Sequence, residues 1–234
     1  MAPVARELKS DWGVLEPFQT EDSIDGQVQE LRTVLVENGD LPLILIGFSW
    51  GAWLSFIFAA NYSAFVRKLI LVGSGPFEEK YAVGIQKTRL NRLSQKDRKE
   101  AESLIKILSE SATKHQTRVF KRLGELYSRA DAYGPVTQKS ESVDFRFVIF
   151  QRVWKEAEKL RRSGKLLQLG EAIKCPVVAI HGDYDPHPAE GVQRPLATML
   201  KDFRLIPLKN CGHKPWIEQK AREEFFRILR VELV

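Results

Sequence analysis

The chain has 234 residues, of which 44% are apolar, so it can bury the core of one large α/β domain, with or without an insertion. The formal net charge is +6, and much of the excess Lys and Arg lies in residues 80–129 and 155–165, mixed with acidic and apolar residues. This pattern is typical of solvated helix faces, and without a dense basic run beside aromatic residues it argues against a nucleic-acid partner.

No segment of the sequence has the character of a leader or a membrane anchor. The first twelve residues include Arg6, Glu7, Lys9 and Asp11 and lack the apolar stretch of a signal peptide. The longest apolar run, residues 50–60, is shorter than the about 20 residues that a spanning helix needs. We therefore expect a soluble, cytoplasmic protein with no membrane partner.

The cysteines and histidines do not suggest a disulfide framework or a metal site. Cys175 and Cys211 form no CxxC motif, and each lies at the edge of an apolar run, so we expect two buried free thiols. The four histidines show no paired spacing typical of zinc ligands. We therefore expect no metal and no organic cofactor.

In chain order, the first predicted elements are a strand, a helix and a second strand. Residues 13–18 read as a short strand, and Asp22 or Ser23 can cap the helix that follows. Asn38-Gly39 is expected to end that helix in the left-handed conformation. The next run, 41–46, is almost continuously apolar and predicts a strand buried on both faces.

A helix to about residue 60 and a buried strand at 68–72 come next, and this alternation predicts a parallel sheet with right-handed crossovers. Residues 76–173 are long, charged and rich in helix formers, so we interpret them as a helical insertion. Strand patterns return at two segments, and a helix at about 216–231 closes the chain. The two later strands are expected at 175–180 and 203–207. The predicted division is therefore an α/β core made of residues 1–75 and 174–234, with residues 76–173 as the insertion.

The motif Gly-Phe-Ser-Trp-Gly at residues 47–51 lies between a predicted strand and a predicted helix. In this setting a serine occupies a tight turn and projects its hydroxyl above the sheet, which makes Ser49 a candidate nucleophile. We expect Gly47 and Gly51 to be required because a side chain at either position would collide where strand and helix approach. The alternative is that Ser49 simply caps an ordinary helix.

A serine hydroxyl needs a base to take its proton and an acid to orient that base. Two later predicted strands run into loops that hold such groups: Asp183 and Asp185 after one strand, and His213 after the other. Both loops leave the carboxyl ends of parallel strands, the same edge as Ser49. The alternatives are that the two aspartates only form turns, and that His181 makes structural hydrogen bonds.

Together, these three motifs resemble those of the α/β-hydrolase superfamily. The run 47–51 resembles its nucleophile elbow, 181–185 its acid loop, in which the second acid is normally the catalytic one, and 211–218 its histidine loop. The resemblance implies Ser49 as nucleophile, Asp185 as acid and His213 as base. It also implies a mostly parallel sheet with helices on both faces and a helical cap formed by residues 76–173.

The N-terminal part departs from this resemblance. Family members normally begin with further strands, the last of which leads into a His-Gly-type loop that donates one N–H to the oxyanion hole. Here about a dozen residues precede the strand expected at Val14, and residues 3–9 look more like a helix. We therefore expect an N-terminally shortened fold in which the Trp50 N–H is the remaining oxyanion donor. An N-terminal rearrangement or a partner chain would fill the gap, and the sequence leaves a homodimer open.

The resemblance favours an esterase-like serine hydrolase that acts on a small carboxylic ester or related acyl substrate. One alternative is an aminopeptidase-like relative in which Glu78 and Glu79 recognise an amine, although two such residues can also begin a helix. Another is a weakly active or inactive binding protein on the same fold. Five aromatic residues could line an apolar pocket or simply belong to the core: Phe48, Trp53, Phe77, Tyr184 and Trp216.

Overall fold

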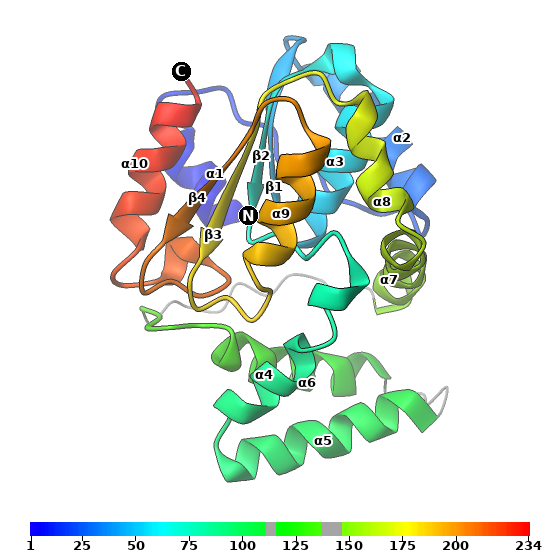
Figure 1. Cartoon of the computed structure of the whole chain (residues 1–234), viewed down its shortest axis with the longest axis vertical. Helices are drawn as coiled ribbons and strands as arrows, with labels where there is room; N and C mark the ends of the chain where they lie inside the picture. The colour runs from blue at the N-terminus through cyan, green and yellow to red at the C-terminus, as the bar shows by residue number, and fades with distance from the viewer. Residues whose placement is uncertain (111–115, 137–146) are drawn as a thin grey trace.

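The computed structural model describes residues 1–110, 116–136 and 147–234, and its described part contains a four-stranded parallel sheet in the order β1-β2-β3-β4 (Figure 1). The strands are β1 Leu43–Phe48, β2 Val66–Val72, β3 Val177–Gly182 and β4 Phe203–Leu208. The helices are α1 Ala2–Leu8, α2 Ile24–Asn38, α3 Trp50–Asn61, α4 Ile85–Arg92, α5 Gln95–Glu110, α6 Gln116–Ala130, α7 Phe147–Arg162, α8 Lys165–Gln168, α9 Glu190–Met199 and α10 Arg222–Glu232.

Helices cover both faces of the sheet, as the sequence predicts, and the strand side chains alternate between two cores. Leu69 and Leu71 of β2 join a cluster with residues of α2, α3, α7 and α9. Ile70 and Val72 face the opposite side and pack with residues of α1 and α10. Because successive side chains of a strand point to opposite faces, an unbroken apolar run such as β2 supplies both cores at once.

The predicted strand at residues 13–18 is wrong, because the structure shows no strand between α1 and β1. Residues 13–20 are irregular, and Phe18 is 80% exposed. Pro17 has no N–H for a ladder hydrogen bond, so apolar residues alone do not make this segment a strand. Within the described part of the chain, β1 therefore forms one edge of the sheet.

The predicted helix after this segment is confirmed as α2, with Ser23 as its N-cap. The Ser23 Oγ accepts a hydrogen bond from the Gly26 N–H at 3.1 Å. The helix ends at Asn38, as expected, but Gly39 is extended, with φ −109°, so the expected left-handed ending is wrong. The α1 helix, Ala2–Leu8, covers all but the last residue of the segment 3–9 that the sequence marks as helical.

The residues between β2 and β3 form two groups of helices. Helices α4, α5 and α6, here called the α4–α6 lobe, lie beyond the ends toward which the strand arrows point (Figure 1). The lobe has a small core of its own around Ala101, Leu123 and Leu126. In contrast, α7 and α8 pack on the sheet core through Val153 and Leu166.

The C-terminal part follows the predicted order with shifted boundaries. β3 and β4 are joined through α9, and the last helix begins at Arg222, after a short 3-10 turn at Pro215–Ile217. Both cysteines are free thiols; Cys211 is buried as expected, whereas Cys175 is only half-buried. No helix among the described residues combines the length and the apolar character that crossing a membrane requires.

Candidate active site

Ser49 lies in a tight turn between β1 and α3, with φ 54° and ψ −116°. A Cβ at Gly47 would lie 2.2 Å from the Gly51 carbonyl oxygen, so the turn requires glycine there. A Cβ at Gly51 would meet nothing within 4 Å, so the predicted collision at that position is wrong. The Ser49 side chain makes no capping hydrogen bond to α3, which leaves its hydroxyl available for another partner.

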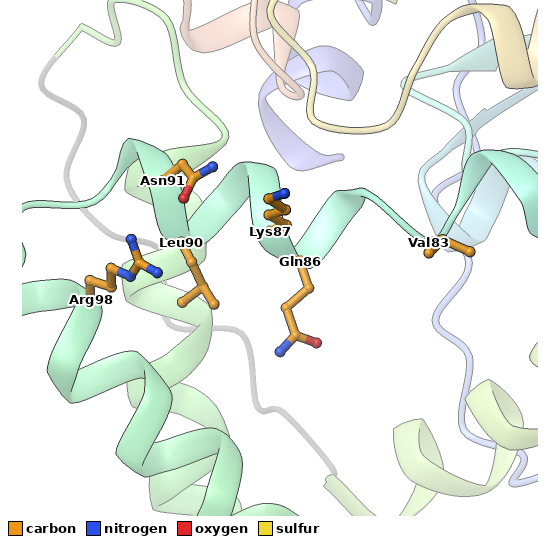
Figure 2. Close-up of a pocket in the computed structure, with 6 residues that line it drawn as sticks. All are labelled: Val83, Gln86, Lys87, Leu90, Asn91 and Arg98. Atoms are coloured by element: carbon orange, nitrogen blue, oxygen red, sulfur yellow. The ribbon is translucent and has the colours of Figure 1, made fainter.

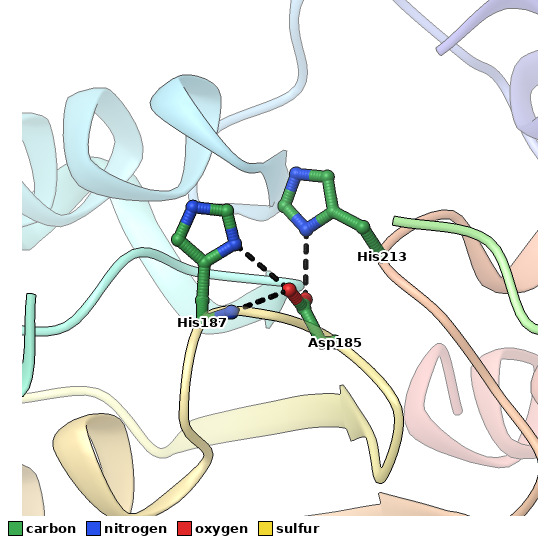
Figure 3. Close-up of side chains that lie close together, drawn as sticks. All are labelled: Asp185, His187 and His213. Carbon is green, nitrogen blue, oxygen red and sulfur yellow. Dashed lines mark hydrogen bonds and ion pairs between the residues drawn. The ribbon is translucent and has the colours of Figure 1, made fainter. Parts of the chain in front are cut away.

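That partner is His213, in the loop after β4. The Ser49 Oγ lies 3.1 Å from the His213 Nε2. On the other side of the ring, the His213 Nδ1 lies 2.7 Å from the Asp185 Oδ2 (Figure 3). With its proton on Nδ1, the imidazole donates to the carboxylate and presents Nε2 as an acceptor for the serine hydroxyl. The structure thus brings together the three residues that the sequence singles out, from the ends of β1, β3 and β4.

The two aspartates of the acid loop have different partners. Asp185 contacts His213, whereas the Asp183 Oδ1 accepts a hydrogen bond from the Cys211 N–H at 3.1 Å and so links the acid loop to the histidine loop. The buried His181 donates from Nε2 to the His187 carbonyl oxygen at 2.7 Å. Asp183 therefore has a structural role, but as a link between two loops rather than as the expected turn former, and the structural alternative describes His181.

The environment of Asp185 favours its charged form. Burial disfavours the ionised carboxylate, but His213 and the hydrogen bonds from His187 and His213 outweigh it, so the pKa of Asp185 lies well below its usual value. An ionised acid beside the base is the arrangement that stabilises an imidazolium.

Sequence reasoning missed His187, which shares Asp185 with His213. The His187 Nδ1 lies 2.8 Å from the Asp185 Oδ1 (Figure 3). The sequence does hold a signal for this contact: His187 follows Asp185 by two residues in the run Asp-Pro-His, so both side chains belong to the same loop. Ligand atoms of Asp185, His187 and His213 lie within 4.8 Å of one another, a donor set that could also hold a metal ion, although the same groups already hydrogen-bond to one another.

A second buried carboxylate, Glu218, organises the histidine loop. It accepts hydrogen bonds from the backbone N–H groups of Gly212 at 3.0 Å, Tyr133 at 2.9 Å and Gly134 at 2.7 Å. In addition, the backbone N–H of His213 donates to the backbone carbonyl oxygen of Asp131 at 2.8 Å. The segment that follows α6 and the loop that carries the candidate base are therefore held as one unit.

Replacing Glu218 with glutamine is expected to lower the free energy of unfolding by about 3 kcal/mol, because an amide nitrogen then faces a buried N–H donor. Urea unfolding followed by circular dichroism measures the change. The matched control is Glu223→Gln, an exposed position at which we expect a change within about 0.5 kcal/mol. Equal stability of both variants would contradict this role of Glu218.

The five predicted pocket aromatics fall into two groups. Phe48 packs against His213, with ring centroids 4.8 Å apart, and against Trp216 at 4.6 Å. Tyr184 lies under the guanidinium of Arg92, which also donates to the Tyr184 carbonyl oxygen at 2.7 Å. The structure places Trp53 and Phe77 inside the core, at 1% and 0% exposure, where they offer no open surface.

Trp50, the predicted oxyanion donor, is the first residue of α3, so its N–H has no partner inside that helix. This N–H lies at the positive end of the helix dipole, next to the serine whose hydroxyl contacts His213. The residues that precede β1 form α1, an irregular segment and α2, and their described part includes no His-Gly loop.

A pocket of about 310 Å³ lies in the α4–α6 lobe, and Ser49, Asp185 and His213 are not among the residues that line it (Figure 2). None of the five predicted aromatics lines it. Its walls come from the segment before α4, from α4 itself and from α5: Val83, Gln86, Lys87, Leu90, Asn91 and Arg98.

The two acids considered for amine recognition have cationic partners. The Glu79 Oε2 accepts a hydrogen bond from the Arg161 Nε at 2.8 Å. Glu78 pairs with Lys80 at 2.9 Å. Their charges are thus already compensated, which weakens the aminopeptidase-like alternative.

Comparisons with known proteins point to one fold. A family model described as the alpha/beta hydrolase fold matches residues 17–219. A search of curated proteins gave no match. Among solved structures, VinJ superposes with a TM-score of 0.59 at 16% identity over 93% of this chain and 74% of that one.

Two further solved structures also align with most of this chain. A proline iminopeptidase from Mycobacterium smegmatis gives a TM-score of 0.57 at 16% identity, over 93% of this chain and 73% of that one. An esterase from Rhodococcus sp. gives a TM-score of 0.57 at 15% identity, over 99% of this chain and 83% of that one. At such identities the likeness shows the fold alone.

Proposed function

This chain belongs to the α/β-hydrolase fold family, and from that premise we propose that it is a serine hydrolase acting on small carboxylic esters or related acyl compounds. Ser49 is the nucleophile, His213 the general base and Asp185 the acid that orients it. The observation that carries the proposal is the continuous hydrogen-bonded series from the Ser49 Oγ through His213 to Asp185, with distances of 3.1 and 2.7 Å.

In the first half-reaction, the His213 Nε2 takes the Ser49 proton as the hydroxyl oxygen attacks the substrate carbonyl carbon. Asp185 stabilises the imidazolium that forms, a role that suits its low pKa. The Trp50 N–H donates to the oxyanion of the tetrahedral intermediate. His213 then gives its proton to the leaving oxygen, and the acyl group remains on Ser49.

In the second half-reaction, His213 accepts a proton from water as that water attacks the acyl carbon. The tetrahedral intermediate collapses, the proton returns to the Ser49 Oγ, and the carboxylic acid leaves. Every proton step uses groups of this chain, so the mechanism uses no metal or organic cofactor.

Aromatic residues beside the site favour a partly apolar acyl substrate. We propose that the α4–α6 lobe acts as the cap, since it lies beyond the carboxyl ends of the strands, where ligands bind in α/β sheets (Figure 1). Phe48, Tyr184 and Trp216 are the aromatic residues that would contact the substrate or the loops beside it.

The direct test is hydrolysis of short p-nitrophenyl esters, with proline p-nitroanilide as the comparison. We expect ester turnover with burst kinetics and a much slower reaction of the anilide. Addition of EDTA should leave the ester rate unchanged, because no metal enters the proposed mechanism; the heat-unfolded protein is the control for reaction with surface groups. Ester hydrolysis no faster than that control, or a rate abolished by EDTA, would contradict the proposal.

A further inference from the structure

The candidate acid lies among three imidazoles: His213 and His187 each hydrogen-bond to one of its oxygens, and the His181 Nε2 lies 3.6 Å from the Oδ2. His213 contacts the Asp185 Oδ2 through Nδ1 at 2.7 Å, and His187 contacts the Oδ1 through its own Nδ1 at 2.8 Å (Figure 3). The His187 backbone N–H also donates to the Oδ1, at 2.9 Å. The carboxylate therefore has two donors on the oxygen that faces away from the candidate base.

The His187 ring is held from several sides. Its backbone carbonyl accepts a hydrogen bond from the His181 Nε2 at 2.7 Å, and its ring lies beside that of His213 with centroids 4.7 Å apart. The charged and titratable groups that act on it are Asp185, His213 and Arg89. Arg89 itself forms a bidentate pair with Asp131.

Burial lowers the pKa of His187 to about 4, against the opposing effect of Asp185. The ring is therefore neutral at pH 7 and carries a single N–H. Because an ionised carboxylate only accepts hydrogen bonds, that proton is on the Nδ1 that faces Asp185. His187 is thus a neutral donor to the acid, whereas His213 is the group that gains a proton during turnover.

We propose that His187 is a positioning residue of the hydrolase: its Nδ1–H holds the Asp185 carboxylate so that the Oδ2 stays directed at the His213 Nδ1. A carboxylate can rotate about its Cβ–Cγ bond, and donors on both oxygens restrict that rotation. The donor also favours the ionised form of Asp185. This inference rests on the proposed function, in which Asp185 orients the base.

Three substitutions of His187 separate hydrogen bonding from packing. Asparagine places an amide N–H at the position of Nδ1, glutamine places it farther out, near Nε2, and leucine removes it. For His187→Leu we expect kcat to fall about ten-fold with little change in KM, because one hydrogen bond to a charged group is lost. His187→Gln should resemble leucine, and His187→Asn should restore kcat to within about three-fold of wild type.

The pH profile of kcat distinguishes a positioning role of His187 from a purely structural one, because a purely structural role would leave the profile unchanged. Without the donor, the Asp185–His213 pair binds its inactivating proton more tightly, so the acid limb of kcat against pH moves to higher pH in the Leu and Gln variants. The Asn variant should keep the wild-type acid limb. Circular dichroism melting of all three variants checks that each is folded.

Proton NMR tests the same contact without turnover. In wild type, we expect the His213 Nδ1 proton to give a low-field resonance that shifts in His187→Leu and stays in place in His187→Asn. The inference would be overturned if wild type, His187→Asn and His187→Leu had the same kcat, the same acid limb and the same resonance. It would also be overturned if His187→Asn and His187→Gln lost the same share of kcat. If wild type shows no turnover that depends on Ser49, the proposed function fails, whereas the NMR comparison still decides whether His187 holds the Asp185–His213 pair.

Discussion

Replacing Ser49 with alanine is expected to lower kcat on a p-nitrophenyl ester by on the order of 10⁶-fold. The alanine has no oxygen to attack the carbonyl, so only the residual effect of binding and oxyanion stabilisation remains. Stability should change little, because the Ser49 hydroxyl makes no capping bond to α3 and, among the described residues, hydrogen-bonds to His213. We expect the free energy of unfolding to stay within about 0.5 kcal/mol of wild type.

The matched control is Ser55→Ala, a buried serine within α3 that has no role in the proposed mechanism. Steady-state rates of both variants, with urea unfolding in parallel, separate loss of chemistry from loss of fold. If Ser49→Ala kept a rate within about ten-fold of wild type, Ser49 would not be the nucleophile.

Replacing Asp185 with asparagine should lower kcat about 10⁴-fold. The amide can donate to the His213 Nδ1, which would favour the tautomer with its proton on Nε2, and that tautomer cannot accept the Ser49 proton. The amide nitrogen cannot accept the buried hydrogen bonds that His187 and His213 make to this carboxylate, so we expect the free energy of unfolding to fall as well. Steady-state rates measured beside urea unfolding show whether the folded variant has lost the chemistry.

Asp183→Asn is the control for this prediction. The Asp183 Oδ1 accepts the Cys211 N–H, and an amide oxygen can accept the same bond. We therefore expect kcat to stay within about three-fold of wild type. A larger loss for Asp183→Asn than for Asp185→Asn would show that the wrong acid has been assigned.

The three central residues could be predicted from the sequence because their positions depend on local features. A strand that runs into Gly-Phe-Ser-Trp-Gly and then a helix creates the turn at Ser49, and parallel strands carry the loops of Asp185 and His213 to the same edge. The apolar runs also located all four strands of the described sheet. β3 and most of β2 are buried on both faces, which leaves a strong signal in the sequence. β1 is only partly buried, so the expectation of a strand buried on both faces there is wrong.

The remaining features depend on contacts between distant segments. Glu218 organises backbone groups of residues 133, 134 and 212, which no spacing in the sequence connects. His187 reaches Asp185 only because its loop turns back on itself. Likewise, the strand expected at 13–18 is absent because no neighbouring strand pairs with that segment in the described structure, whatever its apolar content.

The most direct test of the central claim is reaction of the native protein with a fluorophosphonate probe, followed by peptide mapping of the labelled site. The account predicts a covalent adduct on Ser49 that is absent from Ser49→Ala and forms far more slowly in His213→Ala. Absence of labelling in the folded wild-type protein, or an adduct on another residue with Ser49 unmodified, would contradict it.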